Sequence, residues 1–382
     1  MPHLSANIPL TILGLLFHLK QFSLFGYPIH LVLCPSTNYF TSINKPNRLN
    51  YRNFAQIDSH VIRLQNMKIA ELLNQPGTAF SFEILPPLKG KGIDNLIHTI
   101  EKLKEFSPIY INITNHRSEP VYTDAGNGLL TRTMVKRRPG TVALAAMMQE
   151  RFQIPIVPHI LCSGFSKYDT EYLLIDLKIL GIENLLLLRG DKGREDRSFV
   201  AMEGGYSHAT ELQAQVNRFN EGFFLDGSSI CHSDRVFSYG VACYPEKHEE
   251  APNLHSDLHW FKAKVEAGAE YGVTQMFFDN NKYFDFVAQC RSLGIQVPIV
   301  PGIKPITRRS QLTLLPKCFH CDLPEALTEE LLHCQSDEEI RAVGIEWCID
   351  QCKELKKAGV PNIHFYSNGQ WPDIYEVAKA IY

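Results

Sequence analysis

The sequence lacks a marked excess of charge of either sign and an apolar run of bilayer length. Its 382 residues include 38 Lys and Arg against 41 Asp and Glu, a formal net charge of -3. Because proteins that bind nucleic acid concentrate basic charge on one face, we expect no nucleic-acid partner. The apolar stretch from Ile8 to Leu19 contains His18 and is too short to cross a bilayer, so no membrane attachment is expected.

The sequence also lacks the regular cysteine spacing of a disulfide framework. Its 10 cysteines are scattered, and a chain of this length does not depend on disulfides to fold. We therefore expect buried thiols in a reducing cytoplasm. The group Cys318, His320, Cys321, His333 and Cys334 contains a Cys-x-x-Cys pair with the spacing of half a zinc site. No second pair follows, so packing thiols are the preferred interpretation and no metal is expected.

The signature motifs of three enzyme classes are missing. No strand candidate is followed by the Gly-x-Gly-x-x-Gly turn of a dinucleotide-binding sheet. The chain has no Gly-x-Ser-x-Gly elbow of a serine hydrolase and no phosphate-binding Walker loop. These absences argue against an open nucleotide-binding sheet and against nucleophilic hydrolysis.

The first 66 residues differ from the rest of the chain. They carry neither the basic segment that precedes a secretory signal nor the small-x-small cleavage site that follows it, and residues 35–65 are polar without periodicity. An amphipathic helical pattern begins at Met67. We therefore expect residues 1–66 to be a poorly ordered extension outside the functional protein, and residues 67–382 to form one catalytic domain. A genuine targeting segment is the alternative.

From residue 79 onward, apolar runs of strand length alternate with amphipathic helical stretches, which is the pattern of a parallel sheet. Eight strands with eight crossovers can close into a barrel that has no sheet edge. With 45% hydrophobic residues, the chain can fill such a core. The sequence therefore predicts an α/β fold, a (β/α)8 TIM barrel with an irregular N-terminal extension, rather than a doubly wound open sheet. The strand candidates are Ala79–Leu85, Ile109–Thr114, Ile156–Cys162, Asn184–Leu188, Phe237–Tyr244, Val273–Phe278, Pro298–Ile303 and Ile363–Ser367. The helix candidates are Gly92–Glu105, Thr141–Arg151, Lys167–Leu180, His208–Asn220, His255–Ala267, Lys282–Ser292, Gln311–Leu315, Asp337–Ala358 and Pro372–Ile381.

The first strand candidate holds an acid within an apolar run. Period-2 alternation puts Phe80, Phe82 and Ile84 on one face, with Ser81 and Glu83 on the other. A glutamate in such a run should lose solvation, so its pKa should rise. It would then stay protonated near neutral pH and could donate a proton. A water-facing glutamate on an edge strand is the alternative.

Polar groups follow most of the other strands at the end where barrels carry their active sites. The second strand ends in Thr114, and the fourth ends in Arg189, Gly190 and Asp191, where the glycine would permit close approach of a flat ligand. A strand-ending turn with a rim salt bridge is the alternative interpretation of the fourth strand. Similar candidates, on strands or the helices after them, are His159, Tyr244, Glu246, His248, Asp257, Lys264 and Gln275. For His159 alone, a core histidine with satisfied hydrogen bonds is the usual explanation.

Several of these groups lie in motifs that recur in one order along the chain. They are Phe82-Glu83 followed by Pro86-Pro87, the Thr114 strand end, Pro158-His159, Leu188-Arg-Gly-Asp191, Tyr244-Pro-Glu-x-His248, Lys264-x-x-x-Gly268-Ala269, Thr274-Gln-x-Phe-Phe-Asp279, Pro301-Gly-Ile303 and His364-Phe-Tyr366. This order resembles methylenetetrahydrofolate reductases over residues 68–382. The resemblance implies a flavin-containing (β/α)8 barrel that reduces 5,10-methylenetetrahydrofolate to 5-methyltetrahydrofolate with NADH or NADPH, feeding methionine synthesis. It also implies the short bacterial type, with the catalytic barrel only.

The resemblance assigns roles to individual residues. It implies that Glu83 is the general acid that protonates N10 of the folate, and that Asp191 stabilises the resulting N5 iminium cation and contacts the substrate. It implies that Gln275 and Gln311 hold the folate substrate and that Thr114 lies on the nicotinamide side. The FAD contacts that it implies are His159, Arg189, Gly190, Asp191, Ala209, Tyr244, His248, Asp257 and Lys264.

The chain departs from the family pattern at some of these positions. Gly369-Gln370 stands where a typical bacterial member has an Asn-Arg pair whose Arg helps to bind folate, which leaves the binding of the folate tail open. Asn115 and Leu315 replace a Tyr and a Phe that could stack on the ligands. Trp260 and Ala263 occupy positions where the family often has Asn and Arg contacting FAD.

Two other functions remain as alternatives. One is a flavin-free, pterin-binding barrel that transfers a methyl group, and the other is a non-catalytic folate- or flavin-binding relic. The sequence does not distinguish NADH from NADPH, because a barrel offers no ribose-reading motif. The bacterial relatives suggest a homo-oligomer in the cytoplasm.

Overall fold

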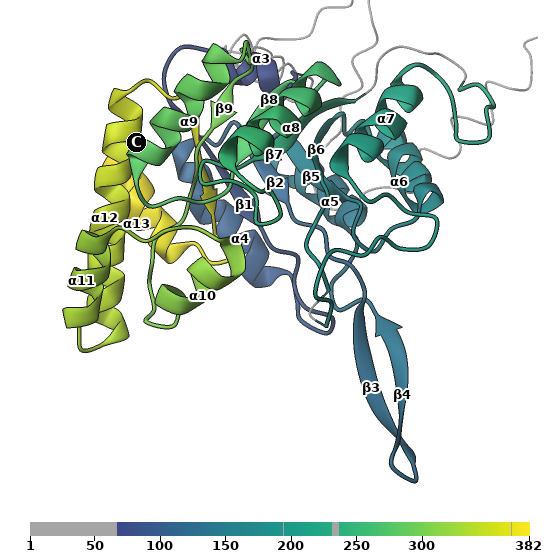
Figure 1. The fold of residues 1–382 in the computed structure, drawn as a ribbon, viewed down its shortest axis with the longest axis horizontal. Helices are drawn as coiled ribbons and strands as arrows, with labels where there is room; N and C mark the ends of the chain where they lie inside the picture. Colours follow the sequence, from purple (N-terminus) through teal and green to yellow (C-terminus); the bar gives the residue numbers. More distant parts are fainter. Residues whose placement is uncertain (1–66, 194, 231–236, 368) are drawn as a thin grey trace, which may run out of the picture. The chain divides into compact units, whose positions relative to one another are not determined.

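The computed structural model has a ring of parallel strands at its centre (Figure 1). The structure describes residues 67–193, 195–230, 237–367 and 369–382. The strands are hydrogen-bonded in the order β10-β11-β1-β2-β5-β6-β7-β8-β9, and every pair is parallel. Their bounds are β1 (Ala79–Ile84), β2 (Tyr110–Ile113), β5 (Ile156–Leu161), β6 (Asn184–Leu188), β7 (Ser238–Cys243), β8 (Tyr271–Thr274), β9 (Ile299–Val300), β10 (Gly302–Ile303) and β11 (Asn362–Tyr366).

The ring closes through β9 and β10, which are the two halves of one predicted strand. The first half pairs with β8, with Ile299 opposite Gly272. The second half pairs with β11, with Ile303 opposite Phe365. Pro301, which has no backbone N–H to donate to a ladder, separates the halves. The (β/α)8 barrel expected from the sequence is therefore confirmed.

The side chains of β1 point alternately to the core under the helices and to the interior of the ring. Phe80, Phe82 and Ile84 are buried in the main core between the sheet and the helices. By alternation, Ser81 and Glu83 face the interior of the ring. β1 is paired on both sides, with β11 and with β2. The alternative that Glu83 lies on a water-facing edge strand is therefore wrong.

Helices surround the strands (Figure 1). All nine predicted helices after residue 90 are present, although the one predicted at Gln311–Leu315 continues to Phe319 and α11 was not predicted. Within the described ranges, no helix is both long and apolar enough to span a bilayer. The helices are α4 (Asp94–Leu103), α5 (Thr141–Phe152), α6 (Lys167–Ile179), α7 (Ala209–Asn220), α8 (Leu254–Glu266), α9 (Asn280–Ser292), α10 (Gln311–Phe319), α11 (Glu325–His333), α12 (Asp337–Lys357) and α13 (Pro372–Ile381), with a 3-10 turn η1 (Lys104–Phe106) after α4.

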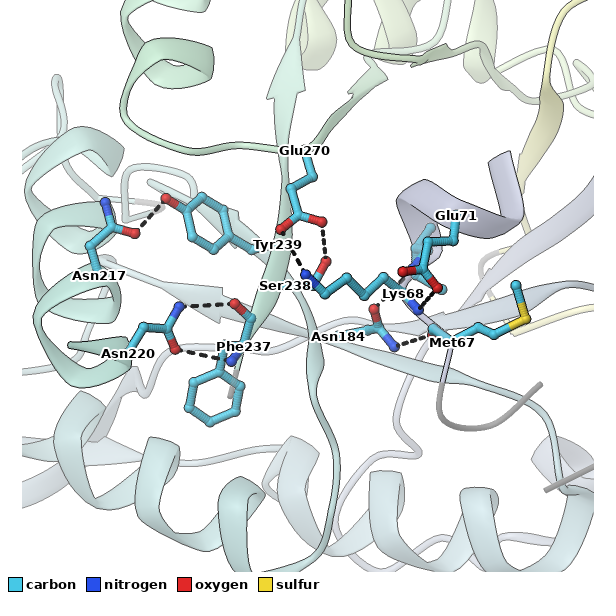
Figure 2. A network of polar contacts seen from close by, with 11 residues as sticks. Met67, Lys68, Glu71, Asn184, Asn217, Asn220, Phe237, Ser238, Tyr239 and Glu270 are labelled. Carbon is cyan, nitrogen blue, oxygen red and sulfur yellow. Dashed lines mark hydrogen bonds and ion pairs between the residues drawn. The ribbon is translucent and has the colours of Figure 1, made fainter. Parts of the chain in front are cut away.

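A short helix, α3 (Ile69–Leu73), closes the amino-terminal end of the ring. Ile69, Leu72 and Leu73 are buried in one cluster with interior residues of the strands. Asn184, the first residue of β6, accepts a hydrogen bond from the Ile69 N–H at 3.0 Å and donates one to the Met67 carbonyl at 3.2 Å (Figure 2). The segment that begins at Met67 therefore belongs to the barrel. Residues 1–66, with the apolar stretch at Ile8–Leu19, lie outside the described residues.

Further polar contacts at this end hold β7 against α7 (Figure 2). The Tyr239 hydroxyl donates to Asn217 Oδ1 at 2.7 Å. Asn220 donates to the Phe237 carbonyl at 2.9 Å and accepts from its N–H at 3.0 Å. These side chains satisfy backbone groups that the strand ends leave unpaired. Hydrogen bonds thus hold the elements of the amino-terminal end together, and the candidate site lies at the opposite, carboxyl end, where barrels carry their active sites.

A two-stranded antiparallel hairpin, β3 (Glu119–Gly126) and β4 (Leu129–Val135), interrupts the connection from β2 to α5. It extends away from the barrel on the side opposite α3 (Figure 1). The hairpin is absent from the predicted elements, although Asn127-Gly128 at its tip is a hairpin turn signal and Asn127 has a φ of 57°.

Candidate active site at the carboxyl end of the barrel

The first part of the site is a buried acid on β1. The Glu83 side chain is only 15% exposed. Burial raises its pKa from 4.5 to about 8, and the charge of Lys304 opposes this shift only in part. The cause is desolvation of the carboxylate in the barrel interior, as the sequence predicted. Glu83 is therefore protonated near neutral pH and can donate a proton.

His159 on β5 faces this acid. Its Nε2 lies 3.6 Å from Glu83 Oε2. Burial, and then the charge of His116, lower the pKa of His159 to about 3, so the imidazole is neutral where Glu83 is protonated. The contact is therefore one between two neutral groups rather than an ion pair. Nε2 is buried and makes no hydrogen bond within the described parts of the chain. A donor or acceptor of a ligand could occupy this free position.

A polar layer lies beside the acid in the barrel interior. A hydrogen bond of 2.8 Å joins His364 Nδ1 to Ser81 Oγ, which also accepts one from Asn362 Nδ2 at 2.6 Å. His364 Nε2 lies 3.5 Å from Asn112 Nδ2. Burial lowers the pKa of His364 to about 3. The sequence analysis gave these residues no role, although polar residues that alternate with apolar ones in β2 and β11 were the available signal.

The strand end after β2 lies on the same rim. Thr114 Oγ1 is 3.1 Å from His116 Nε2 and 3.4 Å from the Ile84 carbonyl oxygen. Asn115, one of the departures from the family pattern, accepts a hydrogen bond from the His116 N–H at 2.9 Å. Burial, and then the charge of Arg138, lower the pKa of His116. These contacts put His116, which the sequence places on the rim with Thr114 and to which the resemblance gives no role, beside Thr114 at the end of β2.

The turn after β6 brings a cation and an anion to the mouth. Arg189 pairs with Glu250 and lies 4.6 Å from the centroid of the Phe199 ring. Gly190 has a φ of 81°, and a Cβ built there would lie 2.8 Å from Ser163 Cβ. The space beside Gly190 is thus filled by the chain itself, and the predicted approach of a flat ligand at this point remains a prediction.

Asp191 follows directly and is exposed on the rim. Desolvation, and then the negative charge of Glu249, raise its pKa, while Arg189 opposes them. β1 and β6 run parallel, so Glu83 and Asp191 lie at the same end of the fold. A shared end is the arrangement that the roles implied for these two acids need.

A third group surrounds Tyr244 after β7. Its ring meets that of His248 edge to face, with centroids 4.8 Å apart. The His248 N–H donates to Asp257 Oδ2 at 3.0 Å. Lys264 Nζ lies 5.9 Å from the centroid of the Tyr244 ring and donates to the Ala242 carbonyl at 3.1 Å. Burial lowers the pKa of Lys264 and raises that of Asp257. Four predicted FAD contacts are thus gathered in one cluster.

Three further predicted contacts come from other elements, and one of them, Gln275, donates its N–H to the carbonyl of Cys243, which precedes Tyr244, at 2.9 Å. Ala209 is the first residue of α7. Gln275 follows β8, and its Oε1 accepts from the Met276 N–H at 3.0 Å. Gln311 Oε1 accepts hydrogen bonds from the N–H groups of Thr307 and Arg308, at 2.7 and 3.0 Å. Its side-chain carbonyl therefore shapes the loop before α10, and its contact with the folate remains a prediction.

The other departures from the family pattern have different surroundings. Leu315 is buried in a core cluster under α11 and α12, whereas Trp260 is 58% exposed on α8. Ala263 lies on the same helix and is half-buried. The Gln370 N–H donates to the Ser367 carbonyl at 3.0 Å in the turn after β11.

The cysteine group shows no metal-binding arrangement in the part of the chain that the structure describes. Cys321 and Cys334 are buried in the core cluster of α10, α11 and α12, and Cys318 is exposed. His320 Nε2 pairs with Glu249 Oε2 at 2.7 Å, and His333 Nδ1 lies 2.7 Å from the Glu329 carbonyl oxygen. The two histidines thus have partners other than the thiols.

The arrangement suits a bound flavin in three respects. A buried imidazole offers an unpaired nitrogen, at His159. A tyrosine, a histidine and a lysine lie together at the end of β7, and an arginine and an aspartate lie at the end of β6. Aromatic faces, cations and unsatisfied polar atoms are groups that can bind a flat, polar ring system with a phosphate tail.

Comparison with known proteins identifies the family of the chain. The family profile described as methylenetetrahydrofolate reductase matches residues 68–381. Methylenetetrahydrofolate reductase (NADH) 1 of Arabidopsis thaliana is 31% identical over 304 residues, which cover 78% of this chain and 48% of the plant protein. A probable methylenetetrahydrofolate reductase (NADPH) of Caenorhabditis elegans is 28% identical over 323 residues, 83% of this chain and 44% of the worm protein. The 5,10-methylenetetrahydrofolate reductase of Pectobacterium carotovorum is 28% identical over 305 residues, 79% of this chain and 89% of the bacterial protein.

The chain spans about half the length of the plant and animal relatives and most of the bacterial one. In all three, the matched part is long enough to contain the whole barrel, and the family profile begins beside α3 and ends in the last helix. The resemblance seen in the order of strand-end motifs is thus confirmed, and the chain belongs to the methylenetetrahydrofolate reductase family.

Proposed function

We propose that this protein reduces 5,10-methylenetetrahydrofolate to 5-methyltetrahydrofolate, with FAD as cofactor and NADH or NADPH as hydride donor. The observation that carries the proposal is the buried carboxyl of Glu83, whose pKa is raised to about 8 by desolvation at the mouth of the barrel. A neutral carboxyl in this position is suited to give a proton to a weakly basic nitrogen. The nitrogen that the resemblance implies is N10 of the folate.

Glu83 would act first. Its proton, given to N10, makes that nitrogen a leaving group, and the five-membered ring that joins N5 and N10 opens. The carbon between them stays on N5 as an iminium cation. Neutral His159, at 3.6 Å, does not compete as a base, because its pKa is lowered to about 3. The carboxyl therefore keeps its proton until the folate arrives.

Asp191 would act on the cation. Its carboxylate stands on the same rim, and a fixed negative charge near the iminium lowers the energy of the charged state. Arg189, which opposes the raised pKa of Asp191, helps to keep the carboxylate ionised. The proton donor and the charge stabiliser are thus two carboxyl groups in different surroundings, one buried and one on the rim.

FAD would be held by the Tyr244 cluster and the residues that precede it along the rim. When bound, it would carry the hydride from the nicotinamide to the folate. Around the Tyr244 ring lie the His248 imidazole, with centroids 4.8 Å apart, and Lys264 Nζ, 5.9 Å from the ring centroid. We further propose that Thr114 contacts the nicotinamide, that Gln275 and Gln311 contact the folate, and that the other implied FAD contacts are His159, Arg189, Gly190, Asp191, Ala209 and Asp257.

The test is anaerobic reduction of the purified protein. We expect a yellow protein that bleaches with NADH or NADPH and recovers its colour when methylenetetrahydrofolate is added. Glu83→Gln should still bleach, since the acid takes no part in that step, but should not recover. A colourless protein that binds folate would contradict the proposal and favour the flavin-free methyltransferase. Recovery at the wild-type rate in Glu83→Gln would remove the role of the acid.

A further inference from the structure

Two exposed histidines, His255 and His259, lie on α8 away from the core. The inner face of this helix is occupied: Leu258 and Phe261 are buried in the main core, and Asp257 accepts the His248 N–H. The two histidines are four residues apart, so their side chains lie on one stripe of the helix, one turn from each other. This stripe takes part neither in the core nor in the Tyr244 cluster.

The imidazole rings of the two histidines converge. His255 Nε2 lies 3.1 Å from His259 Nε2, and the ring centroids are 4.5 Å apart with the ring planes at 88°. A neutral imidazole has one nitrogen that carries a hydrogen and one that carries a lone pair. Two N–H groups facing each other would repel, and so would two lone pairs, so a hydrogen on one Nε2 joins the pair. A cation bound to both lone pairs can take the place of that hydrogen.

The separation of the two nitrogens is that of two ligands of one metal ion. An imidazole nitrogen binds Zn²⁺ at about 2.0–2.1 Å. Two such nitrogens that meet the ion at an angle between about 90° and 110° are then about 2.8 to 3.4 Å apart. The observed 3.1 Å lies inside this interval. The backbone of α8 therefore already holds the two side chains at the spacing that a shared ion needs.

The rest of the coordination would come from water. In the ranges that the structure describes, no group of three His, Cys, Asp or Glu residues is placed to hold a metal ion, so the pair has no third protein ligand. Both histidines are exposed, which leaves the other positions open to solvent. Imidazole nitrogen suits Zn²⁺, Cu²⁺ and Ni²⁺, whereas Mg²⁺ and Ca²⁺ prefer oxygen ligands. The pair is thus suited to a reversible site for the first three ions.

We propose that His255 and His259 together bind one divalent transition-metal ion through their Nε2 atoms, on the exposed stripe of α8. The inference does not rest on the proposed function, because neither histidine is among the implied FAD, nicotinamide or folate contacts. The unfolded chain does not hold the two imidazoles together, so a bound ion should stabilise the folded protein.

The test measures binding of Ni²⁺ to the untagged, metal-free protein by calorimetry, with Trp260 as a reporter of position. Trp260 follows His259 directly and is 58% exposed. Paramagnetic Ni²⁺ quenches the fluorescence of a nearby indole, whereas Zn²⁺ does not. We expect Ni²⁺ to quench Trp260 in a saturable way, excess Zn²⁺ to restore the fluorescence, and Mg²⁺ to have no effect. Trp260→Phe should remove this signal and leave the calorimetric binding in place.

Each histidine is tested by its own variant. His255→Gln and His259→Gln should each raise the Kd for Ni²⁺ by about 10²-fold, because the second imidazole of a chelate acts at a high effective concentration. Each should also abolish the increase in the urea midpoint that Ni²⁺ gives the wild type. His98→Gln is the matched control, since His98 is exposed on α4 with Lys102, rather than a histidine, one turn further on. It should change neither the Kd nor the midpoint.

The inference is overturned if either His255→Gln or His259→Gln keeps the wild-type Kd, because a single imidazole or a group elsewhere would then bind the ion. It is also overturned if Mg²⁺ acts like Ni²⁺, or if the wild type shows no saturable quenching. The pair would then be an ordinary polar stripe on a solvated helix. Because binding is measured without turnover, a protein that fails to reduce folate would refute the proposed function and leave the metal site standing.

Discussion

Replacing Glu83 by Gln should stabilise the protein at neutral pH while it removes the proton donor. Burial raises the pKa of Glu83 from 4.5 to about 8. Between these values the unfolded chain releases a proton that the folded protein retains, so the wild type loses stability as the pH rises. Gln has nearly the same shape and does not titrate. The variant therefore escapes this loss.

The size of the effect follows from the two pKa values. The stabilising contribution of a group with a raised pKa is complete below its unfolded value and is lost by the time the pH passes the folded value, here about 8. Each pH unit in that interval is worth about 1.4 kcal/mol, so the wild type should lose about 3 kcal/mol relative to the variant between pH 5 and pH 8. The lowered pKa values of His159 and His364 act at acid pH in the opposite direction, but both proteins contain these residues.

The assay is urea unfolding of both proteins at several pH values between 5 and 8, followed by circular dichroism. The prediction is tested by the difference in the free energy of unfolding between Glu83→Gln and the wild type. This difference should grow as the pH rises. Glu203→Gln is a matched control, because Glu203 is an exposed loop residue. A difference that stays constant with pH would refute the assignment of a desolvated, protonated Glu83.

Three further predictions concern the same rim. The rate of flavin reoxidation by methylenetetrahydrofolate should be constant at neutral pH and fall about tenfold per pH unit above pH 8, as the Glu83 carboxyl with its pKa of about 8 ionises. Stopped-flow absorbance measures this rate, and a rate that increases above pH 8 would contradict the acid role. Asp191→Asn should slow flavin reoxidation by the folate roughly 10²-fold and should slow bleaching by NADH far less, because only the folate step develops a cation. Equal slowing of both steps would argue against the charge-stabilising role of Asp191. Gly190→Ala should lower the free energy of unfolding by about 2 kcal/mol, because an L side chain is strained at a φ of 81° and its Cβ would lie 2.8 Å from Ser163 Cβ. Urea unfolding tests this, and an unchanged midpoint would show that the turn relaxes.

The order of strands and helices could be predicted because the periodicity in this chain is strong. The barrel itself, the start of α3 and the alternation in β1 are all confirmed by the structure. The break between β9 and β10 was missed, since a single apolar run does not show that a proline separates its two pairing partners. The hairpin β3–β4 was missed because strand periodicity there does not coincide with a buried face, and most of its residues are exposed.

The candidate site could be predicted only in part, for a physical reason. Strand ends identify which residues share the rim, so Glu83, Asp191 and Tyr244 were found from the sequence. Contacts between side chains on different strands depend on register, which the sequence does not state. The proximity of His159 to Glu83 is of this kind. The hydrogen bonds that the Gln311 side-chain carbonyl accepts from the loop before α10 also depend on local geometry, which the sequence does not show.

Closure of the barrel and the acidity of Glu83 depend on each other. A carboxyl on the edge of an open sheet would be hydrated and ionised at neutral pH. Here β1 is paired with β11 on one side and with β2 on the other. β11 pairs in turn with β10, the strand after Pro301 that completes the ring. The interior that results withholds water from Glu83 and leaves it next to a neutral imidazole. The enclosed barrel thus keeps a proton on an acid that would lose it in water, at a cost in folding stability of about 3 kcal/mol at neutral pH. This protonated state is the one that the proposed proton transfer requires.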